Sequence, residues 1–224
     1  MLGRLVLAHL FADFVLQTRW LVVRKRTLAG LAAHAAIVGL AMVPVTWDRL
    51  DRWWPWLLVV TAIHAALDWA KLRLEQRLGR ATARRLPPIV PFLADQALHL
   101  LTLAAAVALA GAADASTLDW QWWVASAYLA GTFGLSIALP LWLDPPSLMR
   151  RPAAARLTVM VTSALVLTLA WRGWPVLIPL VGLVLYHAAA RRLGRQPVTA
   201  TFPIEFWAAV ALSASLGWML TALP

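Results

Sequence analysis

Long runs of apolar residues, separated by short polar or basic stretches, make up most of this chain. About 20 apolar residues are needed for an α-helix to cross a lipid bilayer. Eight runs reach or approach that length, at residues 2–23, 28–47, 53–72, 88–112, 120–143, 157–171, 176–190 and 202–220. The sixth and seventh are short, so they form either two spans joined by a tight turn or one re-entrant pair. The pattern predicts an all-α, polytopic membrane helix bundle of about eight transmembrane helices.

Composition supports this fold class and excludes others. Of the 224 residues, 62% are hydrophobic and only 13% are charged, and the mean hydropathy is +0.72. A soluble domain is about half apolar and a quarter charged, so a water-soluble globule is excluded. The chain has no cysteine, which also excludes disulfides, thiolate metal sites and thiol catalysis.

Positive charge is concentrated in alternate connections between the apolar runs. The chain has 20 Lys and Arg residues against 10 Asp and Glu, which gives a formal net charge of +10. Most basic residues lie in four stretches, at 24–26, 71–85, 150–156 and 191–195. Because Lys and Arg resist translocation, we expect an inner-membrane protein with these loops in the cytoplasm and both termini on the extracytoplasmic side. Topology then explains the charge excess, and we expect no nucleic-acid partner.

Polar side chains are distributed unequally between the two halves of the chain. The last four runs offer only Ser, Thr, His187 and Glu205. An ionisable side chain at the centre of a bilayer costs about 2.5–3.5 kcal/mol, so it usually faces a partner or a wet cavity. The first four runs contain many such side chains or their amide equivalents: His9, Asp13, Gln17, His34, His64, Asp68, Asp95, Gln96 and His99.

The spacing of these polar residues predicts that they converge. Residues four apart share one face of an α-helix, and three sets follow this spacing: His9, Asp13 and Gln17; His64 and Asp68; Asp95 and His99. The third run crosses inward and the fourth outward, so the reversed order of the last set brings both histidines to a similar depth. We therefore expect one layer of polar groups in the inner half of the membrane.

Imidazole and carboxylate groups together are typical ligands of zinc or manganese, so this layer predicts a divalent metal site. His64, Asp68, Asp95 and His99 are the predicted ligands, and His9 or Asp13 is a further ligand or a general base. Gln17, His34 and Gln96 are expected behind them, orienting the ligands by hydrogen bonds. The number of groups allows one ion or two. The same residue types also serve as hydrogen-bonded pairs between helices, as a proton relay or, less well, as haem ligands.

The motif His9-Leu10-Phe11-Ala12-Asp13-Phe14-Val15-Leu16-Gln17, followed by Trp20 and Lys25, is similar to a known family pattern. It resembles an uncharacterised bacterial integral-membrane family, a domain of unknown function with the ordered pattern HxxxDFxLQ, a lone helical His, HxxxD and DQxxH. His34, the pair His64 and Asp68, and the set Asp95, Gln96 and His99 match the later positions. The resemblance covers about residues 1–110 and implies a bacterial membrane location but no activity. A looser similarity is to membrane-bound metal-dependent hydrolases.

These observations define two modules and two candidate functions. Residues 1–112 are predicted to form a four-helix membrane module that carries the His/Asp cluster. Residues 113–224 are predicted to form a four-helix scaffold, or a surface for a protein partner or a second copy. If the protein is an enzyme, metal-assisted hydrolysis of a lipid-like substrate with an anionic headgroup is the most economical chemistry. The alternative is a non-catalytic membrane subunit or a small ion- or proton-coupled transporter.

Overall fold

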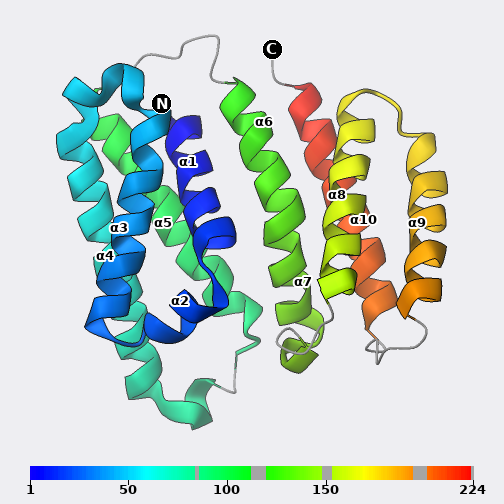
Figure 1. Cartoon of the computed structure of the whole chain (residues 1–224), viewed down its shortest axis with the longest axis horizontal. Helices are drawn as coiled ribbons and strands as arrows, with labels where there is room; N and C mark the ends of the chain where they lie inside the picture. The colour runs from blue at the N-terminus through cyan, green and yellow to red at the C-terminus, as the bar shows by residue number, and fades with distance from the viewer. Residues whose placement is uncertain (84–85, 112–119, 148–152, 194–200, 223–224) are drawn as a thin grey trace. The chain divides into compact units, whose positions relative to one another are not determined.

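The computed structural model describes residues 1–83, 86–111, 120–147, 153–193 and 201–222, and every regular element in them is helical. This confirms the predicted all-α class. The elements are α1 (Leu2–Phe11), η1 (Ala12–Leu16), α2 (Arg19–Arg24), α3 (Leu28–Val45), η2 (Trp47–Arg49), α4 (Leu50–Ala83), α5 (Ile89–Leu109), α6 (Trp120–Leu129), η3 (Ala130–Gly134), α7 (Leu135–Leu143), η4 (Pro145–Ser147), α8 (Ala153–Trp171), α9 (Leu177–Leu193) and α10 (Phe202–Thr221) (Figure 1).

Five helical stretches of the described residues are long and apolar enough to cross a bilayer. They are α3, α5, the stretch Trp120–Leu143 formed by α6, η3 and α7, α8, and α10. The chain is therefore a multi-pass membrane protein. The full number of eight spans and the side on which the termini lie stay predictions.

The chain divides into two compact units, Met1–Ser126 and Ala127–Pro224, and the division falls inside α6. The module boundary that the sequence predicts, between residues 112 and 113, lies outside the described residues. Several of the basic residues used to predict topology lie outside them too: Arg84, Arg85, Arg150, Arg151 and Arg195.

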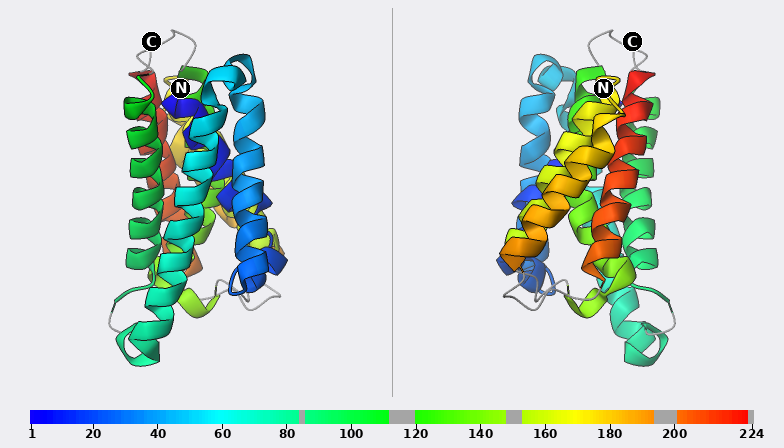
Figure 2. Two further views of the ribbon diagram at one scale, coloured as in Figure 1. Left: turned by 90° about the vertical axis from the view of Figure 1, so that its left-hand side faces the viewer. Right: turned by 90° about the vertical axis from the view of Figure 1, so that its right-hand side faces the viewer.

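Four helices of the first unit form a closed ring. α1 packs on α3, α3 on α4, α4 on α5, and α5 on α1, and they run side by side in two perpendicular views (Figures 1 and 2). Each helix turns an apolar residue inward, so that Leu5, Val38, Val60 and Leu103 are all buried. The interior of this ring is where the polar residues of the first four runs would have to meet.

The first apolar run is not the single helix that the sequence predicts over residues 2–23. It continues from α1 into a π-helical turn, η1, and the helix ends at Gln17, whose ψ angle is 80°. A new helix, α2, starts after Thr18, whose hydroxyl oxygen accepts the backbone N–H of Leu21 at 3.4 Å. The first turn of α3 needs a glycine at position 30, because a Cβ there would overlap the carbonyl oxygen of Arg24.

Basic residues gather at one end of this ring. α4 is continuous to Ala83 and extends past its neighbours (Figure 2). Lys25 and Arg26, from the connection between α2 and α3, line a pocket together with Arg73 of α4. Two of the predicted cytoplasmic stretches therefore lie at the same end of the unit.

An exposed ion pair joins two elements away from this basic end. Arg4 of α1 donates a hydrogen bond to the carboxylate of Asp48 in η2, and it also donates to the carbonyl oxygen of Val45 at 3.2 Å. The hydrogen bond from Arg4 lowers the pKa of the Asp48 carboxyl below its usual value. These two contacts link the start of α1 to η2 and to the end of α3.

The second unit is built around α8 and α10, with α7 and α9 packed beside them. Gly217 allows the two central helices to approach closely, since a Cβ there would lie 2.5 Å from the carbonyl oxygen of Leu167. The core is apolar around Phe206 and Val166. Within its described residues, this unit has no group of three His, Asp or Glu side chains close enough to share a metal ion.

Candidate metal centre

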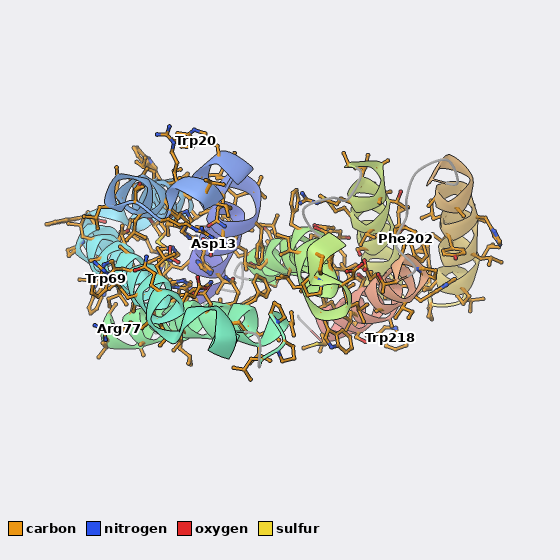
Figure 3. The ribbon with its side chains drawn as sticks, turned by 90° about the horizontal axis from the view of Figure 1, so that it is seen from below. Asp13, Trp20, Trp69, Arg77, Phe202 and Trp218 are labelled. Carbon is orange, nitrogen blue, oxygen red and sulfur yellow. The ribbon has the colours of Figure 1, made fainter. Side chains whose placement is uncertain are left out.

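Four helices deliver the predicted polar residues to the interior of the first unit. α1 and η1 carry His9 and Asp13, α3 carries His34, α4 carries His64 and Asp68, and α5 carries Asp95, Gln96 and His99. The four histidines and Asp68 are buried, and the Asp13 side chain is 8% exposed. Seen along the helices, Asp13 lies between them whereas Trp20 lies at the periphery (Figure 3). The predicted convergence of these groups is thus found in the structure.

Four side-chain atoms from three helices form the tightest group. The Nε2 atom of His34 lies 3.1 Å from Nε2 of His64, 3.2 Å from Oδ1 of Asp13 and 3.5 Å from Oδ2 of Asp68. The Nε2 atom of His64 lies 3.5 Å from the same Asp68 oxygen and 3.9 Å from Oδ1 of Asp13. Two imidazole nitrogens and two carboxylate oxygens thus face one another.

These distances match the spacing of ligand atoms around a small divalent ion. With zinc–ligand bonds of about 2.0–2.1 Å, neighbouring atoms of a tetrahedral site are about 3.3 Å apart. The five distances in the group lie between 3.1 and 3.9 Å. Ligand atoms of Asp13, His34 and His64 all lie within 4.8 Å of one another, and so do those of His64, Asp68 and His99. The buried His/Asp groups could therefore hold a metal ion.

The remaining predicted residues surround this group in different ways. The amide Nε2 of Gln96 donates to Oδ2 of Asp13 at 3.4 Å, and Oε1 of Gln17 accepts from Lys25 at 2.9 Å. His34, which the sequence places behind the ligands, lies at the middle of the group. Asp95, which the sequence places among the ligands, is 3.7 Å from Nε2 of His99 and belongs to neither potential metal group.

Two lysines belong to the cluster and were not among the predicted site residues. Lys25 Nζ lies 2.7 Å from Oδ2 of Asp68, and Lys71 Nζ donates to Oδ2 of Asp95 at 2.8 Å. Sequence reasoning assigned both to the cytoplasmic charge excess. A signal was nevertheless present, since Lys71 follows Asp68 by three residues on one helix and so shares its face.

The charges of these side chains do not cancel. Asp13, Asp68 and Asp95 bring three negative charges, and Lys25 and Lys71 bring two positive charges. With neutral imidazoles, the cluster keeps one negative charge in a buried place. Isolated charge is costly to bury, so a bound cation would stabilise this arrangement.

The fold and this centre define the class of protein: a multi-pass helical membrane protein with a buried His/Asp centre in its N-terminal unit. The chain belongs to the family described as Protein of unknown function (DUF3307), which matches residues 1–128. The expected membership of an uncharacterised family is thereby confirmed, and the matched region contains the whole cluster. The family's detailed motif pattern and a bacterial origin stay predictions. No curated protein and no solved structure matches the chain.

Proposed function

We propose that this chain is a metal-dependent hydrolase of the bacterial inner membrane that acts on a lipid-like substrate. The observation that carries the proposal is the group formed by Asp13, His34, His64 and Asp68, because five distances between its nitrogen and oxygen atoms lie between 3.1 and 3.9 Å, close to the spacing of ligand atoms around a zinc ion. Such an ion would polarise a substrate oxygen and activate a water molecule for attack.

The chain's own residues have four tasks in this proposal. Asp13 and Asp68 supply the negative charge that attracts the cation, and His34 and His64 hold it between α3 and α4. Gln96 keeps the Asp13 carboxylate in place through its amide hydrogen bond. His9, whose Nε2 lies 3.9 Å from Oδ2 of Asp13, completes the coordination or accepts the proton from water.

A pocket at the basic end supports a substrate with an anionic headgroup and an apolar tail. Its volume is about 180 Å³. Lys25, Arg26 and Arg73 supply positive charge at the pocket, and Leu31 and Trp69 supply apolar walls. Lys25 also touches Asp68, so a headgroup bound there would lie one side chain away from the centre. The cytoplasmic leaflet, which basic residues favour, is rich in such lipids.

Bound metal is the first expected result. Protein purified in detergent without chelator should contain a divalent ion, zinc or manganese, in elemental analysis. Removing it with a chelator should lower the melting temperature, since a ligand that binds only the folded state stabilises that state by mass action. Re-addition of the metal should restore it. Protein that is free of metal and has the same melting temperature with and without chelator would contradict the proposal.

The pocket gives a second expected result. Arg73→Gln should weaken binding of a short-chain lipid phosphate by roughly 10- to 100-fold, because a hydrogen bond to a charged group contributes about 1.5–3 kcal/mol. Arg77→Gln is the matched control, since Arg77 is an exposed arginine of the same helix that does not line the pocket. Binding of inorganic phosphate is measured in the same way. Comparing it with binding of the lipid phosphate distinguishes a site for lipids from a site for any anion. Equal weakening by both variants would argue against a role for the pocket.

A non-catalytic subunit or proton-coupled transporter is the second candidate. One contact favours this candidate. The Nε2 atoms of His34 and His64 are 3.1 Å apart, a distance that also fits a hydrogen bond without any ion. In that arrangement one ring nitrogen carries a proton and the other accepts it, whereas metal binding requires lone pairs on both. A protein partner or a second copy would then bind through the later helices. Elemental analysis separates the two candidates.

A further inference from the structure

Two buried ring nitrogens of the cluster take no part in the four-atom group. His9 is 1% exposed and His99 is 2% exposed. Neither Nε2 atom has a hydrogen-bond partner among the residues that the structure describes. Buried polar atoms are nearly always paired, so two unpaired imidazole nitrogens in one cluster indicate a binding site for a further ligand.

The carboxylates of Asp13 and Asp68 each point one oxygen toward these two histidines. Oδ1 of Asp13 faces His34, while its Oδ2 lies 3.9 Å from Nε2 of His9. Oδ2 of Asp68 faces His34 and His64, while its Oδ1 lies 3.8 Å from Nε2 of His99. Each carboxylate therefore presents one oxygen to either side, as a carboxylate does when it bridges two metal ions.

The second set of atoms also draws together in space. The rings of His9 and His99 have their centroids 5.2 Å apart, although they come from α1 and α5. Oδ1 of Asp95 lies 3.7 Å from Nε2 of His99 and offers a further oxygen. The distances from His9 to Asp13 and from His99 to Asp68 and Asp95 are 3.7–3.9 Å, a few tenths of an ångström longer than the spacing of ligand atoms in a tetrahedral zinc site.

We infer that the centre holds two divalent ions, the second bound by His9, His99 and the outer oxygens of Asp13 and Asp68. The inference rests on the proposed function, because the second ion shares both carboxylates with the first. Two ions bridged in this way lie about 3.5–4 Å apart in hydrolytic enzymes, where they hold the attacking and leaving oxygens of the substrate.

Charge determines how the second ion binds. The cluster's five charged side chains sum to one negative charge, so one divalent ion leaves a single positive charge and two leave three. An anion, either a bridging hydroxide or a phosphate group, must therefore accompany the second ion. The second ion therefore binds more weakly than the first, and inorganic phosphate increases the affinity of the centre for the second ion.

Metal stoichiometry tests the inference. Metal-free protein, obtained with a chelator, is titrated with Mn²⁺ in detergent with and without inorganic phosphate, and bound manganese is measured per chain. We expect two ions at saturation, with electron spin resonance showing magnetic coupling between them. His9→Gln and His99→Gln should each bind one uncoupled ion. His187→Gln, which replaces an exposed histidine of α9, is the matched control and should still bind two.

Each outcome has a distinct meaning. One ion in the wild type, unchanged in His9→Gln, overturns the two-ion centre but leaves the proposed single-ion function standing. Two ions that persist in both His9→Gln and His99→Gln place the second ion elsewhere and also overturn the inference. No bound ion in folded wild-type protein overturns the proposed function itself. Melting curves for each variant show whether the chain is folded, so that lost metal is not mistaken for lost structure.

Discussion

Replacing His64 by alanine is expected to weaken metal binding by well over 100-fold. Loss of a residue that merely orients a ligand already costs about 10–100-fold in metal affinity, and His64 is itself a ligand in the proposed centre. It is also the one residue common to both potential metal groups. Its ring stacks on that of His99 at a centroid distance of 4.1 Å. The measurement is the affinity for zinc, by competition with a chromophoric chelator.

Two further variants make this result specific. His187→Ala removes an exposed histidine of the second unit and should leave the affinity unchanged. His64→Gln keeps most of the side-chain volume, so its melting curve separates a lost ligand from a lost fold. If zinc binds His64→Ala as tightly as the wild type while both proteins are folded, the ion is held elsewhere and the assigned centre is wrong.

Replacing Lys25 by methionine is expected to destabilise the metal-free protein by about 3 kcal/mol. The change keeps the aliphatic stem and removes the ammonium group that lies 2.7 Å from Asp68. The Lys25 side chain is 15% exposed and that of Asp68 is 6% exposed. Breaking a buried ion pair leaves one charge uncompensated, which typically costs about 3–5 kcal/mol. The measurement is the unfolding free energy in detergent with chelator present.

The same variant should bind a divalent ion more tightly, by at least roughly 10-fold, because one positive charge no longer repels the ion. Metal should therefore restore most of the lost stability of Lys25→Met. Arg77→Met, a change on an exposed part of α4, is the control and should alter neither quantity. Equal destabilisation of both variants, or weaker metal binding by Lys25→Met, would show that Lys25 does not compensate charge in the cluster.

Regular helical spacing explains why much of this centre could be predicted. His64 and Asp68 sit one turn apart on α4, which is helical throughout as its pattern indicates, and their relative position follows from that alone. His99 likewise follows Asp95 on α5. Because the two helices pack as neighbours, the sets meet at a similar depth. Local periodicity and chain direction were sufficient to predict the relative positions of these two pairs.

Other parts depended on tertiary structure that periodicity does not encode. His34 has no polar neighbour four residues away. The spacing of polar residues therefore could not show that His34 lies at the middle of the four-atom group. Gln17 was placed on a straight helix that in fact ends there, which turns its side chain toward Lys25. Lys25 and Lys71 were explained by topology, because a count of charges by loop does not distinguish a lysine in water from one folded back onto a carboxylate.

The π-helical turn that carries Asp13 has a consequence for how this centre changes over evolutionary time. Such a turn holds one residue more than an α-helical turn. Deleting Ala12, the first residue of the turn, would rewind the helix and rotate Asp13 by about 100° relative to His9. Insertions and deletions in this turn thus change the direction of the Asp13 side chain without replacing any residue of the cluster. The turn is a point where descendants of one sequence can change the geometry of the His/Asp cluster while every residue of the cluster is retained.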